Sequence, residues 1–406
     1  MKPKITIIST GHIDHGKSTL VGRIIYELKQ QLTNWGAVDI SNGNFANFLD
    51  QLEEERVGQM TIDVVHSQVE GKKYQLEFID APGHKEFIQN MMTGASDAEG
   101  AQLVVSVAEN EGIEEQTVRH LFLLKLFGIN QIIVAVNKMD RVNYSESRYN
   151  ILCAEIKKIM GEMGIDYSNI YFVPISARQG ENVTVKSEKM AWWQGKSYID
   201  TLEDYFTPKE DLSEKPFLMP VQDIYEISGE KIIIGKVESG TLNKGDEIFF
   251  PLSGFKACVS AILEFGNEKE LATVGDSIGL KIECGDAKEV SRGDVCSKDF
   301  LLIPKSKIKV KSYVIGEEIG LNQEVSVRIG TRSSLGKVVS IKEIYDPAKK
   351  KETFTSNAEK IVKDNSGELE IELSEPIVGE PFSAYPPLGR VIISSGAIPQ
   401  AAGVVL

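Results

Sequence analysis

The chain has 406 residues, of which 42% are apolar and 26% are charged, and its formal net charge is −14 at pH 7. This length suggests two or three domains, and no apolar run is long enough to span a bilayer, so we expect no membrane partner. The acidic balance argues against DNA or general nucleic-acid binding, because neutralising phosphates requires surplus Lys and Arg, although it leaves room for a local patch that docks one RNA. Four cysteines without metal-binding spacing favour a reduced, cytoplasmic protein without a secretory signal: Cys153, Cys258, Cys284 and Cys296.

The first predicted element is a buried strand, Ile5–Ile8, which runs into GHIDHGKS before a helical pattern from Thr19 onward. The pattern GxxxxGK[ST] between a strand and a helix is typical of a P-loop. Its glycines let backbone N–H groups close around phosphate oxygens, while Lys17 reaches the β- and γ-phosphates and the Ser18 hydroxyl ligates Mg²⁺. The predicted phosphate-binding residues are Gly11, His12, Ile13, Asp14, His15, Gly16, Lys17, Ser18 and Thr19.

A second motif follows the predicted strand Tyr74–Ile79, which runs into Asp80-Ala-Pro-Gly83-His84. A carboxylate at the carboxyl end of a strand, here that of Asp80, can hold Mg²⁺ through a water molecule. Gly83 lets the backbone approach a γ-phosphate closely, because glycine has no side chain. The segment therefore predicts the part of the site that contacts the third phosphate and its metal ion.

Two further loops predict that the base is guanine. Asn137-Lys138-Met139-Asp140 follows the apolar strand Ile132–Val136. An Asp carboxylate there accepts hydrogen bonds from guanine N1–H and N2–H₂, which adenine does not offer. Ser176 and Ala177 follow the predicted strand Tyr171–Ile175, a place suited to contacts with guanine O6. Four motifs in this order, each after a predicted strand, indicate that the ligand is GTP.

Together, GHIDHGKST, DAPGH, NKMD and SA resemble the motifs of the elongation factor Tu and elongation factor 1-alpha family of GTPases. The resemblance covers essentially the whole chain. It implies a Mg²⁺-dependent GTPase that converts GTP to GDP and phosphate and is stimulated by a partner. Segments outside the nucleotide loops that also resemble the family are Phe87–Ser96, Glu115–Thr117, Pro386–Arg390 and Ala401–Val405.

The resemblance also implies roles for single residues. His84 matches the residue that helps to orient the attacking water, and it is the predicted catalytic residue. Thr61 matches the switch I threonine, which joins Ser18 and, through water, Asp80 around Mg²⁺. The chain departs from the family just before Thr61, where Gly58-Gln-Met replaces the usual Arg-Gly-Ile, and the preceding loop is shorter than in elongation factor 1-alpha.

The order of the predicted elements indicates three domains. Strands and helices alternate up to about Phe206, which favours a doubly wound, mostly parallel α/β sheet for a P-loop GTP-binding domain over residues 1–206. A polar linker, 207–216, leads to short alternating strands with glycine turns, which predict two all-β barrels over 217–300 and 301–406. The predicted barrel strands are 219–225, 231–239, 246–250, 257–263 and 277–282, then 307–314, 323–329, 336–345 and 367–373.

The resemblance leaves the partner open between two main readings. We favour an elongation factor that delivers aminoacyl-tRNA to the ribosome, and Val237–Gly240 resembles the place where relatives hold the 3′ end of tRNA. The alternative is the GTPase subunit of sulfate adenylyltransferase, which works with a separate catalytic subunit; the Arg119-His120 pair and the acidic balance lean that way. Termination-factor or ribosome-rescue relatives and a divergent paralogue are further alternatives, and a nucleotide exchange factor is a further candidate partner.

Overall fold

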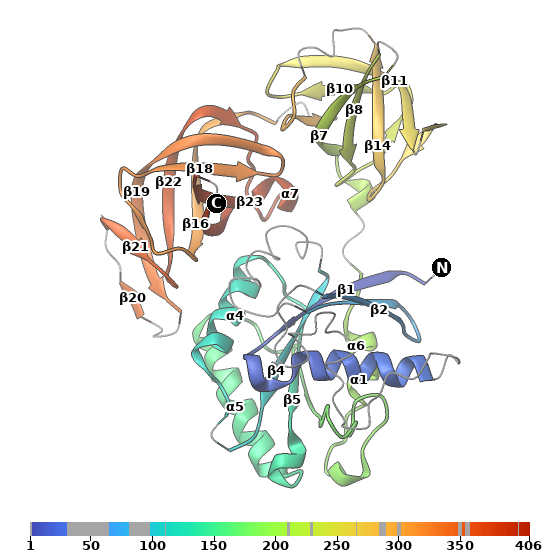
Figure 1. The fold of residues 1–406 in the computed structure, drawn as a ribbon, viewed down its shortest axis with the longest axis vertical. Helices are drawn as coiled ribbons and strands as arrows, with labels where there is room; N and C mark the ends of the chain where they lie inside the picture. The colour runs from blue at the N-terminus through green and yellow to red at the C-terminus, as the bar shows by residue number, and fades with distance from the viewer. Residues whose placement is uncertain are drawn as a thin grey trace. The chain divides into compact units, whose positions relative to one another are not determined.

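The structure is a computed structural model, and it describes residues 2–30, 65–80, 98–109, 111–208, 212–227, 230–264, 266–283, 290–298, 302–347, 351–353, 358–396 and 398–406. The chain divides into two compact units, one that holds the first domain and one that holds both barrels (Figure 1). Among the described residues, no helix has the length and apolar character needed to cross a membrane.

The first domain is built on a six-stranded sheet. Its strands are β1 (Lys4–Thr10), β2 (Val65–Glu70), β3 (Gln75–Asp80), β4 (Gly100–Ser106), β5 (Ile132–Asn137) and β6 (Tyr171–Pro174). The helices described with it are α1 (Lys17–Gln30), α4 (Glu115–Leu126), α5 (Glu146–Glu162) and α6 (Tyr198–Tyr205), with 3-10 turns η1 (Ile13–His15), η4 (Met139–Val142) and η5 (Glu188–Met190). The strand order is β2-β3-β1-β4-β5-β6, and only β2 runs antiparallel to its neighbour. This order confirms the doubly wound, mostly parallel sheet.

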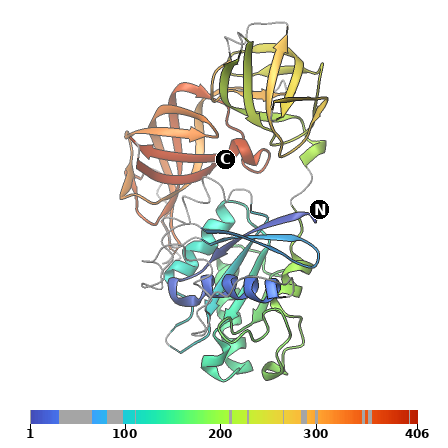
Figure 2. The same cartoon turned by 45° about the vertical axis from the view of Figure 1, so that its right-hand side comes forward.

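Apolar residues on both faces of this sheet form its core. Every residue of β4 and β5 is buried, as expected for parallel strands with helices on both faces. Helices α1 and α6 cover one face, where Ile24 and Leu202 join Ile5 and Ile7 in one apolar cluster. Helices α4 and α5 lie together on the other side of the sheet (Figures 1 and 2).

The second unit contains two all-β barrels. The first barrel has β7 (Leu218–Ile227), β8 (Glu230–Lys236), β10 (Glu247–Phe250), β11 (Phe255–Glu264), β14 (Ser277–Glu283) and β15 (Val295–Ser297). The second has β16 (Lys305–Val314), β18 (Glu324–Ile329), β19 (Arg332–Asp346), β22 (Ser366–Ile377), β23 (Arg390–Ser395) and β24 (Ile398–Val405). Shorter elements are η6 (Leu212–Glu214), α7 (Pro386–Gly389), β9 (Leu242–Asn243), β12 (Asn267–Lys269), β13 (Leu271–Ala272), β17 (Glu318–Gly320), β20 (Lys351–Thr353) and β21 (Lys360–Val362).

Both barrels are closed. In the first, β10 pairs with both β15 and β11, so the order β10-β15-β7-β8-β14-β11 returns to its start. In the second, β18 pairs with both β23 and β19, which closes β18-β23-β24-β16-β22-β19 in the same way. Closure pairs the strand edges that an open sheet would expose. The predicted fold class, one α/β domain followed by two barrels, is confirmed.

The predicted strands match nine of the twelve barrel strands described above, and β15, β23 and β24 are not among them. Strand β24 contains Ala401, Ala402 and Gly403, residue types that are depleted in strands. Gly403 has a packing reason, because a Cβ there would lie 2.3 Å from the carbonyl oxygen of Lys311 on the neighbouring strand. The close approach of the two backbones therefore requires glycine at position 403. Strand propensity gives no sign of this requirement.

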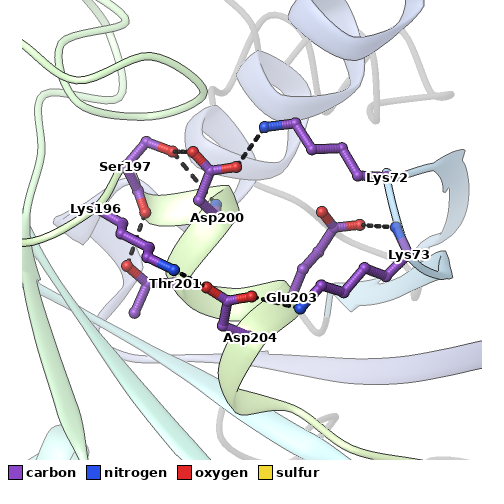
Figure 3. A network of polar contacts seen from close by, with 8 residues as sticks. All are labelled: Lys72, Lys73, Lys196, Ser197, Asp200, Thr201, Glu203 and Asp204. Carbon is purple, nitrogen blue, oxygen red and sulfur yellow. Dashed lines mark hydrogen bonds and ion pairs between the residues drawn. The ribbon is translucent and has the colours of Figure 1, made fainter.

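The turn of the β2–β3 hairpin is tied to α6 by a network of polar contacts (Figure 3). Lys72 and Lys73 form ion pairs with Asp200 and Asp204, each at 2.5 Å. The backbone N–H of Lys73 donates to the carboxylate of Glu203 at 3.1 Å. These contacts hold the hairpin and the helix together although they are about 130 residues apart in the chain.

Among these contacts, the bond to Glu203 contributes most. Exposed ion pairs such as those of Lys72 and Lys73 contribute about 0–1 kcal/mol each. Glu203 is only 2% exposed, and a hydrogen bond to a charged group contributes about 1.5–3 kcal/mol. In the sequence, this hairpin lies between the segments that carry Thr61 and His84. Glu203 therefore fixes the strands to which both segments are attached.

We expect Glu203→Ala to lower the free energy of unfolding of the first domain by about 1–3 kcal/mol, because the Lys73 N–H loses its charged acceptor. All three tryptophans, Trp35, Trp192 and Trp193, belong to the first domain, so urea unfolding followed by tryptophan fluorescence reports on this domain. The control is Glu155→Ala, at an exposed position of α5, which should change the value by less than about 0.5 kcal/mol. Equal stability of the two variants would contradict the role given to Glu203.

Candidate nucleotide-binding site

The predicted site residues follow strands whose carboxyl ends lie at one edge of the sheet. In the strand register, Ser9 of β1 pairs with Asp80 of β3, and Ser106 of β4 pairs with Asn137 of β5. The end of β6, at Pro174, pairs with β5 in the same direction. The loops that follow β1, β3, β5 and β6 therefore begin side by side, where open α/β sheets bind ligands.

The loop after β1 has the backbone shape of a phosphate-binding loop. Gly11 and Gly16 have φ angles of 135° and 89°, which residues with a side chain rarely adopt. A Cβ at Gly11 would lie 2.2 Å from the carbonyl oxygen of Val104, and one at Gly16 would lie 2.6 Å from Nδ2 of Asn137. The loop thus packs directly against β4 and β5. Helix α1 begins at Lys17, two residues earlier than the sequence pattern suggests.

The ammonium group of Lys17 lies inside this loop. The residue is 6% exposed, and its Nζ donates to the carbonyl oxygens of Gly11 at 3.2 Å and His12 at 3.1 Å. A buried ammonium group needs polar partners, and the loop carbonyls supply them. Phosphate oxygens carry negative charge and are stronger acceptors for Nζ than carbonyl oxygens. The loop therefore holds Lys17 ready for a phosphate ligand.

A histidine outside the predicted site supports the loop. His120 of α4 is 2% exposed, and its Nδ1 accepts a hydrogen bond from the backbone N–H of Gly11 at 3.2 Å. This bond requires the tautomer in which Nδ1 carries no proton. In the sequence, His120 stands out only as part of the Arg119-His120 pair, which favours the alternative function. The buried face that it shares with Leu121 and Leu124 is the signal that could have placed it against the sheet.

Asn137 joins the phosphate loop to the loop after β6. Its Nδ2 donates to the carbonyl oxygen of His15 at 2.8 Å, and its Oδ1 accepts from the backbone N–H of Ala177 at 2.9 Å. The residue is 3% exposed, so both bonds form away from water, where an unmade bond costs most. Two predicted base-site residues therefore also set the distance between the base loop and the phosphate loop.

Ser176 orients the carboxylate of Asp140. The Ser176 hydroxyl donates to Oδ1 of Asp140 at 2.6 Å, and its oxygen accepts the backbone N–H of Gln179 at 3.3 Å. A bond to one carboxylate oxygen also fixes the direction of the other oxygen. A carboxylate held in one orientation can accept hydrogen bonds from two neighbouring N–H groups of a base. The contact of this loop with guanine O6 stays a prediction, and the hydroxyl proton of Ser176 goes to Asp140 in this structure.

Lys138 is held at the sheet edge by an acid that the sequence did not single out. Its Nζ pairs with Oε2 of Glu111 at 2.7 Å. Partial burial opposes charge on Glu111, but hydrogen bonds from Lys138 and Ser106 outweigh it and lower the pKa of this carboxyl below its usual value. The carboxylate of Glu111 is therefore ionised at neutral pH. No local sequence signal links Glu111 to Lys138.

The remaining predicted residues divide into two groups. Thr61, Gly83 and His84 lie outside the described residues, and for Asp80 only the backbone at the end of β3 is described. Ser18 and Thr19 stand in the first turn of α1, and the exposed residues Ile13 and Asp14 form the η1 turn. The glycine cradle and buried Lys17 fit a nucleoside triphosphate, and the hydroxyl and carboxylate oxygens of Ser18 and Asp80 suit Mg²⁺.

Three family models match almost the whole length of the chain. The profile of the elongation factor Tu GTP binding domain matches residues 2–260, that of elongation factor Tu domain 2 matches 230–297, and that of the GTP-eEF1A C-terminal domain matches 308–406. Elongation factor 1-alpha of Archaeoglobus fulgidus is 33% identical over 100% of this chain and 98% of its own length. Elongation factor 1-alpha of Metallosphaera sedula is 36% identical over 96% of this chain and 93% of its own length. A crystal structure of Sup35 with GDP covers 100% of this chain and 94% of its own at 24% identity, with a TM-score of 0.46.

We expect Asn137→Ala to weaken nucleotide binding about ten- to a hundredfold, because the buried partners at His15 and Ala177 each lose a bond that contributes roughly 1 kcal/mol. Displacement of a fluorescent GDP analogue measures this affinity. Asn150→Ala, at an exposed position of α5, is the matched control and should bind like the wild type. If Asn137→Ala bound the GDP analogue as tightly as the wild type, the two loops would hold their positions without this amide.

Proposed function

This chain belongs to the GTPase family of elongation factors Tu and 1-alpha, and on that premise we propose that it delivers aminoacyl-tRNA to the ribosome in translation elongation. The observation that carries the proposal is the full-length alignment with elongation factor 1-alpha proteins, which includes both barrels. All of the nucleotide motifs fall in the first domain. GTP hydrolysis alone therefore does not explain why the chain has two barrels, whereas binding of a partner to the barrels would explain them. A cytoplasmic location follows from this proposal, because elongation takes place on ribosomes.

The reaction is hydrolysis of GTP to GDP and phosphate. In the proposed mechanism, backbone N–H groups of the loop from Gly11 to Ser18 bind the phosphates, and Lys17 exchanges its carbonyl partners for β- and γ-phosphate oxygens. Ser18, Thr61 and, through water, Asp80 hold Mg²⁺, which supplies positive charge against the phosphates when it is bound. These groups stabilise the charge that develops on the leaving GDP.

The attacking water needs a separate group to orient it, and we assign this role to His84. In this mechanism of phosphoryl transfer, the protein forms no covalent bond to the substrate. Positioning of the reacting groups therefore contributes a large part of the rate enhancement. We therefore propose that hydrolysis by the chain alone is slow and that a partner places His84 beside the γ-phosphate. The His84 assignment rests on its position directly after the DAPG motif.

The γ-phosphate also serves as the switch signal in this proposal. Thr61 and Gly83 contact the nucleotide only while the third phosphate is present, and both segments relax after hydrolysis. The β2–β3 hairpin between them stays attached to α6 through Glu203. The hairpin would thus give both segments a fixed point of attachment in either state.

The test of tRNA delivery is protection of aminoacyl-tRNA from spontaneous deacylation. We expect the GTP-bound chain to slow hydrolysis of the aminoacyl ester at least about tenfold and the GDP-bound chain to leave it unchanged, because a switch must bind its cargo in one state only. Deacylation is followed with a radiolabelled amino acid at matched protein concentrations. Absence of protection in both states, with nucleotide binding intact, would contradict tRNA delivery and favour a partner such as a sulfate adenylyltransferase catalytic subunit.

A further inference from the structure

Two histidines and a glutamate come together beside the phosphate loop. His12 and His15 belong to the η1 turn and its N-terminal flank, and Glu114 stands directly before α4. Nε2 of His12 lies 3.0 Å from Oε2 of Glu114. One ligand atom from each of the three side chains lies within 4.8 Å of the other two. In the part of the chain that the structure describes, this is the only such group of His, Cys, Asp or Glu side chains.

His15 is the member whose environment needs an explanation. Its side chain is fully buried, at 0% exposure. Neither ring nitrogen has a partner that meets full hydrogen-bond geometry, although the backbone carbonyl of Val104 interacts with the ring and raises its pKa in part. Burial, and after it the neighbouring His12, lower the pKa of His15 to about 4, so the imidazole is neutral at physiological pH. Buried polar groups normally find partners, because leaving them without one is costly.

The contact between His12 and Glu114 accounts for only part of this arrangement. Both side chains are partly exposed, at 25% and 44%, where a polar contact contributes little even between charged groups. The pair gives no partner to His15, whose ring stands edge to face with that of His12 at 5.3 Å between centroids. A ligand that accepts lone pairs from both imidazoles and from the carboxylate would satisfy all three residues.

We propose that His12, His15 and Glu114 bind a divalent first-row transition metal ion of the Zn²⁺ type. Two imidazole nitrogens and one carboxylate oxygen are ligands that Zn²⁺ accepts, whereas Mg²⁺ takes oxygen ligands. Three protein ligands leave one coordination position for water. The backbone carbonyl of Val104 interacts with the His15 ring as a hydrogen-bond acceptor. Backbone carbonyls commonly orient metal-binding histidines in this way.

The site needs only a small contraction to hold the ion. Ligand atoms about 2.1 Å from a tetrahedral ion lie about 3.4 Å from one another. The corresponding separations here are 3.0 Å for the pair of His12 and Glu114 and at most 4.8 Å within the group. His12 and Glu114 are exposed enough to change rotamer, while buried His15 serves as the fixed ligand.

A bound ion would tie the phosphate loop to α4. The same helix already supports the loop through the bond from Gly11 to His120, so the ion would add a second tie at the start of the helix. It would also bring two positive charges close to a loop that binds phosphates. Metal binding at this site requires neither tRNA nor ribosome, so its test is independent of the delivery function proposed above.

The test uses the full-length chain, stripped of metal with a chelator and kept in excess Mg²⁺. Co²⁺ is the first probe, because its visible absorption reports on nitrogen ligands and on coordination geometry. We expect one Co²⁺ per chain, displaced by one equivalent of Zn²⁺ and not by Mg²⁺. Glu114→Gln should weaken Zn²⁺ binding at least about tenfold. The matched control Glu115→Gln, which removes an exposed partner of Arg119, should leave Zn²⁺ binding unchanged.

His15→Asn provides a second variant and should abolish the Co²⁺ absorption band. Tryptophan fluorescence during urea unfolding shows whether this variant is folded, and if it is not, Glu114→Gln decides alone. The proposal is overturned if the wild type shows no visible Co²⁺ band. It is equally overturned if Glu114→Gln and the wild type bind Zn²⁺ with the same affinity, because the metal would then occupy an adventitious site.

Discussion

The side-chain amide of Asn137 connects loops that begin at three different strands. Its two polar atoms bond to the carbonyl of His15 in the phosphate loop and to the N–H of Ala177 in the base loop. A single planar group therefore fixes both distances at once. Because the amide is buried, neither loop can move away without leaving an unpaired polar group behind. If the proposed assignment of these loops is right, the nucleotide meets a site whose base and phosphate ends already have their spacing.

The same site satisfies its own polar groups before a substrate arrives. Lys17 donates to two loop carbonyls, Gly11 donates to His120, and Asp140 accepts from Ser176. In the proposed site, nucleotide binding would exchange these internal hydrogen bonds for bonds to the ligand, and the net gain would come from replacing neutral acceptors by charged phosphate oxygens. Such an arrangement lowers the reorganisation needed when the ligand binds and keeps the loop in one shape without it.

The parts of the site that local backbone chemistry dictates were predictable from the sequence. A P-loop needs glycines with positive φ angles at a fixed spacing. Gly11 and Gly16 can therefore be recognised from the sequence alone, and both have positive φ angles. The support from His120 was not predictable, because the residue lies 109 positions from its partner Gly11. Pairing between Glu111 and Lys138, and the closure of the second barrel by β23 and β24, depend in the same way on distant contacts. Sequence patterns report local preference, whereas these features arise from tertiary packing.

Competition among GDP, IDP and ADP for the site measures guanine recognition most directly. IDP lacks only the 2-amino group of GDP, so the carboxylate of Asp140 loses one of its two hydrogen bonds, which contributes about 1.5–3 kcal/mol. We expect GDP to bind roughly ten- to a hundredfold more tightly than IDP, and ADP not to compete at the concentrations at which GDP does. Equal affinity for GDP and IDP, or effective competition by ADP, would contradict a site in which Ser176 aims Asp140 at the base.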